Sequence, residues 1–411
     1  MQVDLIIRGG VCVSHRGQNR EDIAVRDGMI VAIGDLSSLD AENIIDASGL
    51  HILPGIIDSE FHVSPDFEND TAAAVTGGVT SVLCVSNAPK IGEGYYCDYA
   101  YFKNATHENI EHLAVMEKEE GCAGIHLVMG ATGDFDVIAD DRTLLKVLKS
   151  GSRRVVVHAE DQDRLHERKQ YIKSGNVSSH TQWRDEKIAM DATRRILAIA
   201  RGAGRPVHLQ HISTDKEMAM IAAYKDIATV AVSSNHLFLS APDCRGEENR
   251  VGLWKALTTG VVDVLTSAHN PISVDQKDQD YPNCPSGAPS VQTMVPLMLD
   301  QVSKGAISLE TLADLTSAGP ARIFNVANKG RIAVGYDADF AFVDLKKEWL
   351  LDDDDVQSGC GWDFHAGCSF TGQVIGTVIR GEKIMWDGEL LVPPSGRAIK
   401  FHDTFKEYDA Q

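Results

Sequence analysis

The sequence predicts an α/β fold: a (β/α)8 TIM barrel with a small composite β-sandwich domain formed by both chain ends. The middle of the 411-residue chain alternates short apolar strands with helical segments, which is the order of elements in a barrel of βαβ units. Both ends instead carry short strands separated by turn dipeptides. No Gly-x-Gly-x-x-Gly loop follows the first strand of the alternating region, which favours a barrel over a doubly wound open sheet.

The two chain ends share one pattern of short strands and tight turns. The strands expected there are 5–8, 23–25, 30–33, 338–343 and 376–381. Neither end is long enough to bury a hydrophobic core alone. The sequence therefore predicts that they pair, with residues 1–51 and 331–400 forming the sandwich and residues 52–330 forming the barrel.

The barrel strands follow from apolar runs bounded by turn residues. We expect them at Gly55–Phe61, Thr80–Val85, His112–Val115, Ile125–Met129, Val155–His158, Val207–Ile212, Thr229–Ser233 and Val262–Thr266. Helical spacing of apolar residues is clearest between the later strands, at Asp185–Arg201 and Asp215–Tyr224.

Composition excludes several classes of protein. The chain has 59 acidic residues against 39 Lys and Arg, a net charge of −20, which disfavours nucleic acid and anionic membranes as partners. No apolar run approaches the roughly 18 residues of a membrane span. The N-terminus begins with a strand and lacks the regions of a signal peptide. Eight cysteines without a CxxC pair indicate free thiols, so we expect a cytoplasmic protein.

Polar side chains gather where the predicted barrel strands end, the face on which TIM barrels carry their active sites. Strand alternation places Glu60 and His62 on one side of the first strand. Further imidazoles stand at or near the ends of later strands: His126, His158, His211 and His269. Any one of these is more often a hydrogen-bonded barrel residue, but their convergence on one mouth favours a metal site, since neutral imidazole and carboxylate are ligands of zinc-like ions. His208, three residues before His211, is expected to point away.

Several segments resemble a known family. Residues 53–58, 77–80 and 330–339 are similar to the barrel entry, the turn after the first helix and the return to the sandwich in the amidohydrolase superfamily. More narrowly, residues 124–130, 208–214 and 285–293 resemble dihydroorotases and related cyclic amidohydrolases. The likeness runs over about residues 3 to 401. It implies the same fold and a metal-dependent hydrolysis of cyclic amides.

The comparison with this family also shows departures at the site. Glu60 stands where the family has the first histidine of Asp-x-His-x-His, His126 stands in place of a carboxylated lysine, and Ala268 replaces the aspartate of Ser-Asp-His. His62, His158 and His211 match metal ligands of the family, and Asn87 matches its strand-two asparagine, which implies a role in substrate binding.

Two further departures concern the substrate. The arginine that binds a substrate carboxylate in the family is missing from residues 62–66. After the seventh strand, Ser240–Arg245 replaces a longer segment. Efficient hydrolysis of dihydroorotate is therefore not expected.

Two hypotheses of function follow. In the first, the chain hydrolyses the C–N bond of a cyclic amide with metal-activated water. At most one divalent metal, with zinc the first choice and manganese or iron the alternatives, is held by some of Glu60, His62, His126, His158 and His211, because too few anions remain to compensate two. His269 is then the candidate general base. In the second, the chain is a catalytically inactive dihydroorotase homologue that binds no metal and supports a partner enzyme. The resemblance also implies a homo-oligomer, a dimer or tetramer.

Overall fold

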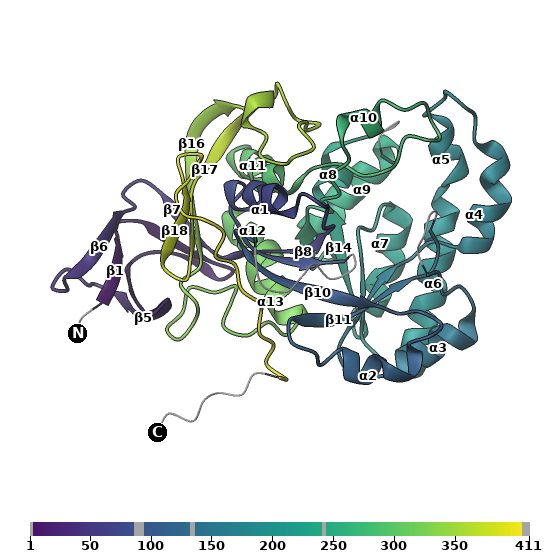
Figure 1. Ribbon diagram of the computed structural model, residues 1–411, viewed down its shortest axis with the longest axis horizontal. Coiled ribbons are helices and arrows are strands. Elements are labelled where there is room, and N and C mark those ends of the chain that lie inside the picture. The colour runs from purple at the N-terminus through teal and green to yellow at the C-terminus, as the bar shows by residue number, and fades with distance from the viewer. Residues whose placement is uncertain (1–2, 86–93, 132–135, 241–243, 405–411) are drawn as a thin grey trace.

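The computed structural model describes residues 3–85, 94–131, 136–240 and 244–404. Figure 1 shows the β-sandwich at the end that holds the N-terminus and the helix-covered barrel at the other end. The predicted fold class is confirmed: eight parallel strands form the barrel, and strands from both chain ends form the sandwich.

The barrel strands run in chain order around the sheet. They are β8 (Ile56–Phe61), β9 (Val79–Cys84), β10 (Asp98–Asn104), β11 (Cys122–Val128), β12 (Val155–His158), β13 (Val207–Leu209), β14 (Ala228–Ser233) and β15 (Val264–Thr266). The first and last strands meet where the backbone N–H of His62 donates to the carbonyl oxygen of His269 at 2.8 Å. This contact places the two strand ends side by side at the mouth of the barrel.

One predicted barrel strand is wrong. His112 ends a 3-10 turn, Ile110–His112, and the residues after it form the short helix α2 (Leu113–Met116). The third strand is instead β10, in which Tyr99, Tyr101 and other side chains are buried. A short apolar run fits a helical turn as well as a strand, whereas an aromatic-rich run such as that of β10 favours a strand. The other seven predicted strands overlap β-strands of the barrel.

Helices cover the outside of the barrel (Figure 1). They are α1 (Phe67–Thr76), α2, α3 (Asp141–Lys149), α4 (Gln162–Arg168), α5 (Ser179–Trp183), α6 (Glu186–Ala203), α7 (Asp215–Ile221), α8 (Ser234–Phe238), α9 (Glu247–Thr258), α10 (Val274–Lys277), α11 (Val291–Ser303), α12 (Leu309–Ala313) and α13 (Gly319–Ile323). The helix expected from Asp185 is confirmed as α6. The Asp185 side chain caps it by accepting from the N–H of Ile188, and Gly204 ends it at a φ of 69°.

The sandwich pairs the two chain ends. One sheet has the order β5-β4-β1-β6 and the other β19-β18-β17-β16-β7-β2-β3. The strands are β1 (Val3–Arg8), β2 (Val11–Ser14), β3 (Gly17–Arg20), β4 (Asp22–Arg26), β5 (Met29–Gly34), β6 (Ala41–Asp46), β7 (His51–Pro54), β16 (Phe340–Leu350), β17 (Ser369–Ile379), β18 (Glu382–Trp386) and β19 (Glu389–Leu390). Antiparallel pairing of β16 with β7 joins the two ends directly.

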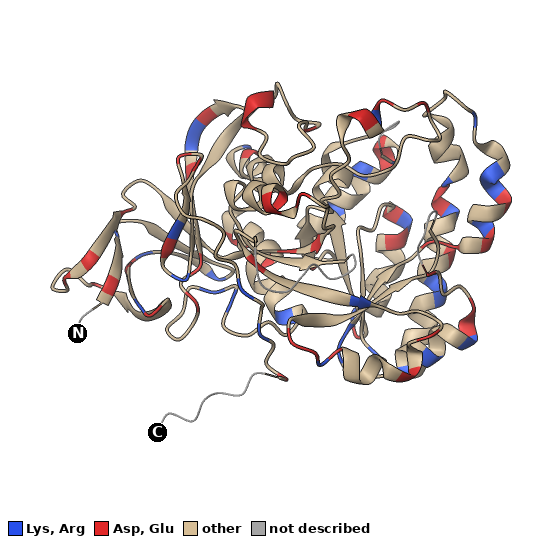
Figure 2. Ribbon diagram, in the orientation of Figure 1, with Lys and Arg blue, Asp and Glu red and all other residues tan. Residues whose placement is uncertain are grey.

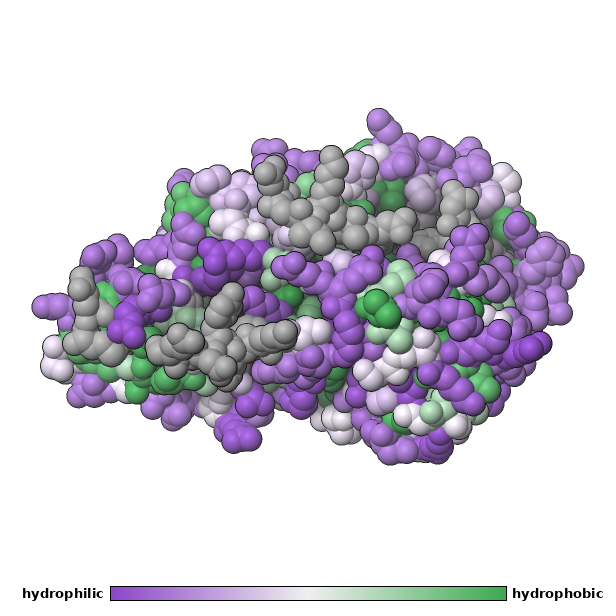
Figure 3. Space-filling view, turned by 60° about the horizontal axis from the view of Figure 1, so that its bottom comes forward, coloured by the Kyte–Doolittle hydropathy of each residue, from purple (hydrophilic) through white to green (hydrophobic). Residues whose placement is uncertain are grey.

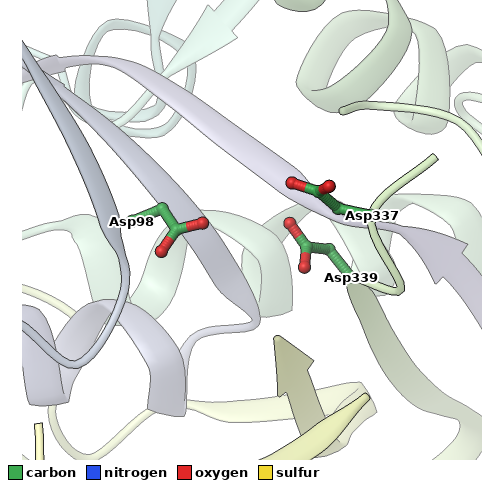
Figure 4. Close-up of side chains that lie close together, drawn as sticks. All are labelled: Asp98, Asp337 and Asp339. Carbon is green, nitrogen blue, oxygen red and sulfur yellow. The ribbon is translucent and has the colours of Figure 1, made fainter. Parts of the chain in front are cut away.

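A buried ion network joins the sandwich to the barrel. Asp98 from β10 and Asp337 and Asp339 from the segment before β16 lie close together (Figure 4). The ammonium group of Lys329 lies 2.7, 3.0 and 2.6 Å from their carboxylates, respectively, and Arg380 also pairs with Asp98. A lysine side chain is thus the cation of this acidic cluster, which gives the cluster a structural role.

The chain returns to the barrel after the sandwich. The carbonyl of Tyr99 in β10 accepts from the N–H of Ile399 at 2.9 Å, although residues up to 400 were expected in the sandwich. Phe401 is buried beneath the guanidinium of Arg153 at 4.7 Å, and Asp403 pairs with Arg153 at 2.7 Å. The C-terminal segment therefore covers the N-terminal face of the barrel, opposite the mouth.

Over the described ranges, length and apolar character decide whether a helix could span a membrane. None of the helices in the described ranges is long and apolar enough to cross a bilayer. Acidic and basic residues are interspersed on the outer helices of the barrel (Figure 2). The face in Figure 3 is largely hydrophilic, with hydrophobic side chains in scattered groups. All eight cysteines lie in the described part of the chain, and none of them is in a disulfide.

Candidate active site at the mouth of the barrel

Glu60 and His62 stand at the end of β8, where the sequence places them. Glu60 is 2% exposed, and burial raises the pKa of its carboxyl to about 7 because a buried carboxylate loses hydration. Burial, together with the charges of the surrounding histidines, lowers the pKa of His62 to about 3. His62 is therefore neutral at pH 7 and keeps a lone pair for a ligand. The structure records no hydrogen bond from its ring to the residues it describes.

His158 and His211 meet Glu60 at this end of the barrel. His158 Nδ1 lies 3.0 Å from His211 Nε2, and His211 Nε2 lies 3.4 Å from Glu60 Oε1. His211 has a φ of 30°, a left-handed conformation that is rare for a residue with a side chain. Such backbone conformations recur at functional sites, where the surrounding structure holds them.

A buried carboxylate sets the orientation of the His158 ring. Glu160 Oε2 lies 3.4 Å from His158 Nε2 and also accepts from the guanidinium of Arg184. A carboxylate next to one ring nitrogen holds the proton there and leaves the lone pair on the other. The lone pair of His158 is therefore on Nδ1, the atom that faces His211.

His126 is held by hydrogen bonds on both sides of its ring. Its Nδ1 lies 2.9 Å from Asn104 Oδ1 and its Nε2 lies 2.9 Å from Gln210 Oε1. Burial lowers the pKa of His126 to about 4, so the ring is neutral and can donate only one proton. Gln210 Nε2 is buried without a partner in this orientation. Exchanging the oxygen and nitrogen of the Gln210 side-chain amide lets its N–H donate to His126 Nε2, which gives both of these nitrogens a hydrogen-bond partner. Neither ring nitrogen then has a free lone pair.

His269 is fully buried behind the mouth, away from solvent. Its Nδ1 accepts from the backbone N–H groups of Ser290 and Val291 at 3.2 and 3.4 Å, so its proton is on Nε2, which faces Asp70 at 3.5 Å. Its ring stacks on Phe61. Its Nε2 has no hydrogen-bond partner among the described residues, and its role as the general base stays a prediction.

Ala268, which the resemblance aligns with an aspartate of the family, has no acid in its side chain. The neighbouring acid, Asp58, is turned inward and accepts from the backbone N–H of Ser267 at 3.0 Å and from the hydroxyls of Thr266 and Ser267. Ala268 itself has a φ of 50°. The carboxylate of Asp58 is therefore occupied in closing the barrel and does not replace the missing acid.

His208 lies apart from this group, and His236 beside it was not predicted. Asn87 lies outside the described residues. His208 is buried in the barrel, with Nδ1 2.9 Å from Thr229 Oγ1, as its spacing from His211 predicts. His236, in α8, lies beside His211 with ring centroids 6.3 Å apart. Its position just after Ser233, at the end of β14, is the signal that could have identified it.

The candidate ligands at the mouth are spaced differently from the three aspartates of the buried ion network. In the part of the chain that the structure describes, Asp98, Asp337 and Asp339 are the group of three that brings one ligand atom each within 4.8 Å, and Lys329 is already their cation. At the mouth, two donor pairs lie close, His158–His211 and His211–Glu60. The mouth therefore presents a chain of adjacent donors and not a compact triad.

Known proteins resemble the chain over almost its whole length. The model of the amidohydrolase family matches residues 51–384. The allantoinase of Rubrobacter xylanophilus is 31% identical over 446 residues and covers 97% of each chain. The dihydroorotase of Pyrococcus furiosus is 29% identical and covers 92% of each chain.

Solved structures agree with these sequence relatives. A dihydropyrimidinase from Brevibacillus agri has a TM-score of 0.89 at 26% identity, covering 98% of this chain and 99% of that chain. An L-hydantoinase from Arthrobacter aurescens has a TM-score of 0.90 at 24% identity, covering 97% and 99%, and supports the fold alone. Because the family model spans most of the chain and a relative of 31% identity covers nearly all of it, the chain belongs to the amidohydrolase family, among its cyclic amidohydrolases.

Proposed function

We propose that this protein hydrolyses the C–N bond of a cyclic amide at the mouth of the barrel, with one divalent metal held by Glu60, His158 and His211 and with His62 beside them. The observation that carries the proposal is the adjacent set of donors, His158 Nδ1, His211 Nε2 and Glu60 Oε1, with separations of 3.0 and 3.4 Å. The resemblance to allantoinase and dihydroorotase supports this reaction class.

Each adjacent pair of donors has the spacing of two ligands on an ion of the zinc type, and binding all three to one ion would require His158 and Glu60, the two ends of this chain of donors, to move closer together. Two ligands about 2.0–2.2 Å from a tetrahedral Zn²⁺ lie roughly 3.3 Å apart, close to both observed separations. Glu60 Oε2 is buried without a hydrogen-bond partner in the described residues, as expected of a carboxylate that serves a ligand. When bound, such an ion polarises the amide carbonyl and lowers the pKa of water to about 7.

Residues of the chain orient the ligands and transfer the proton. Glu160 keeps the proton of His158 on Nε2 and so directs Nδ1 inward. Glu60 would hold such an ion through one carboxylate oxygen, and its other oxygen, Oε2, is the group to accept the proton of the attacking water and pass it to the leaving nitrogen. This assignment gives Glu60 the task of the aspartate that Ala268 lacks.

His126 supports a one-metal site. The family uses a carboxylated lysine at this place to bridge two ions, as the sequence comparison implies. His126 has no free lone pair, because Asn104 and Gln210 engage both ring nitrogens. We therefore assign His126 a positioning role between β10, β11 and the end of β13.

Metal content of the full-length protein tests the proposal. Purification without chelator and elemental analysis should find close to one equivalent of zinc, manganese or iron, and the double variant His158→Ala/His211→Ala should lose it. A matched control is His112→Ala/His166→Ala, two exposed histidines outside the mouth, which should keep the metal. Hydrolysis of hydantoin and of allantoin, followed by loss of ring absorbance, should fall with the metal.

The second candidate is an inactive homologue that supports a partner enzyme. Three observations favour it: Ala268 carries no acid, His126 has no free lone pair, and the donors at the mouth do not form a compact triad within the described residues. A folded protein that contains no metal and hydrolyses neither substrate would support this candidate and exclude the first.

A further inference from the structure

A cationic side chain, Arg245, lies at the mouth of the barrel outside the proposed metal ligands. It stands between α8 and α9, in the loop after β14. Its Nε donates to Ser213 Oγ at 3.2 Å, and its Nη1 donates to the carbonyl oxygen of Arg184. These contacts join the loops that follow β12, β13 and β14, so the guanidinium is held from both sides.

Arg245 is connected to two of the proposed metal ligands through its two hydrogen-bond partners. Ser213, its first partner, is two residues beyond His211. Arg184, its second partner, pairs with the carboxylate of Glu160, and Glu160 contacts His158. A group bound by Arg245 would therefore lie beside the reacting centre.

Among the described residues, no carboxylate forms an ion pair with Arg245. Three carboxylates lie near enough to interact with its charge: Glu160, Glu186 and Glu217. Each is engaged elsewhere. Glu160 pairs with Arg184 and contacts His158, Glu186 binds Lys216 and Asn249, and Glu217 binds Thr193 and Thr214. Among the described residues, Arg245 makes only the two hydrogen bonds given above.

The remaining donors of Arg245 suit a carboxylate. A guanidinium has five N–H donors in a planar fork, and Ser213 and Arg184 use two of them. Both hydrogens of Nη2 and one of Nη1 remain, which is the arrangement that binds a carboxylate through two parallel hydrogen bonds. The chain as a whole has a net charge of −20, so a locally unpaired cation at the mouth is needed to draw in an anionic substrate.

Resting on the proposed function, we propose that Arg245 binds an anionic substituent of the substrate, and that the substrate is a cyclic amide bearing a carboxylate on a side arm. The arginine that the family uses for this purpose follows the first barrel strand and is missing here. Arg245 follows β14, which β15 separates from β8, and its two hydrogen bonds reach the loops after β12 and β13. The carboxylate is therefore bound from a different loop of the mouth, without an arginine after the first strand.

Hydantoin-5-acetate, with its methyl ester as the neutral analogue, tests this inference in the full-length protein. We expect the wild type to bind and turn over the acid roughly 10- to 100-fold better than the ester, the effect of one charge-assisted contact. Arg245→Gln should raise KM for the acid by that factor and leave the ester unchanged, and Arg245→Lys should recover part of the preference. Arg250→Gln, an arginine of α9 paired with Glu247, is the matched control. Thermal melting confirms that each variant is folded.

Binding measured without turnover separates this inference from the proposed function. Calorimetry on chelator-treated protein reports the affinity for acid and ester directly. A preference for the acid that depends on Arg245, in a protein that hydrolyses neither compound, would support the carboxylate site and refute the proposed hydrolysis. Hydrolysis of both compounds without a preference, or an equal loss for both in Arg245→Gln, would overturn the carboxylate site and leave the hydrolase standing.

Discussion

Glu160 Oε2 lies 3.4 Å from His158 Nε2 at the mouth of the barrel, and the same oxygen pairs with Arg184. Both residues belong to the sequence Val157-His158-Ala159-Glu160, so one strand end supplies a candidate ligand and the group that orients it. The cation of Arg184 keeps Glu160 charged: although burial alone would raise its pKa, hydrogen bonding from His158 and the charge of Arg184 lower it to about 2.

This pair predicts the effect of Glu160→Gln. The neutral amide no longer holds the His158 proton on Nε2, so metal affinity should fall by about 10- to 100-fold. Titration of the metal-free protein with zinc, followed by calorimetry, measures the change. Glu167→Gln, an exposed glutamate of α4, serves as control. Unchanged zinc affinity in Glu160→Gln would show that the His158 ring is oriented by other contacts.

Ala268→Asp should increase hydrolysis. The substitution restores an acid at the place where the family has one, and such a group contributes about 10²–10⁴-fold when it acts in proton transfer; a gain of at least about tenfold in kcat is expected. The φ of 50° at this position suits Asp better than Ala. Ala268→Asn has the same shape and backbone preference without the acid and should show no gain. Equal rates for the two variants would place the proton transfer elsewhere.

Lys329→Met should destabilise the fold strongly. It leaves the buried carboxylates of Asp98 and Asp339 and the half-buried carboxylate of Asp337 without their shared cation, and losing one partner of a buried ion pair costs about 3–5 kcal/mol. The variant should regain stability as pH falls and the carboxylates become protonated. Urea denaturation at pH 7 and pH 5 measures both effects. Lys255→Met, an exposed lysine of α9, should change the free energy of unfolding little at either pH.

Asp403→Asn, at the N-terminal face of the barrel, should lower the free energy of unfolding by an amount that depends on pH. Burial alone would raise the pKa of Asp403, but hydrogen bonds from Arg153 and Lys118 outweigh it and lower the pKa to about 2. The folded pKa is below the unfolded value of about 4, so the carboxylate stabilises the fold above pH ~4 and loses this contribution as pH falls toward 2.

The expected difference between wild type and Asp403→Asn is about 1–2 kcal/mol at pH 7, allowing for partial exposure of the ion pair. It should shrink steadily below pH 4. Unfolding by urea at pH 7 and pH 3 measures the two free energies, and Asp353→Asn, an exposed aspartate, is the control. A difference that stays constant down to pH 3 would contradict the role of the carboxylate charge.

Local patterns in the sequence predict most of the barrel because each strand is a short apolar run between turn residues. They fail at His112–Val115, where the run forms a helical turn and the aromatic segment Asp98–Asn104 supplies the third strand. The segment Asp98–Asn104 is a barrel strand because it pairs with β9 on one side and β11 on the other. Such pairing is not encoded in a short window of sequence.

The amino-acid sequence by itself determined the fold class, the family resemblance and the identity of the ligand-type residues at the strand ends. The tertiary structure alone decided which of them have free lone pairs. His126 and His158 look alike in sequence, but Asn104 and Gln210 engage both nitrogens of the first, whereas Glu160 leaves Nδ1 of the second facing His211. The neighbour of His158 Nδ1 is itself a proposed ligand, whose contact a bound metal would replace, whereas the neighbours of His126 are side-chain amides, and all of these neighbours come from strands and loops distant in the chain.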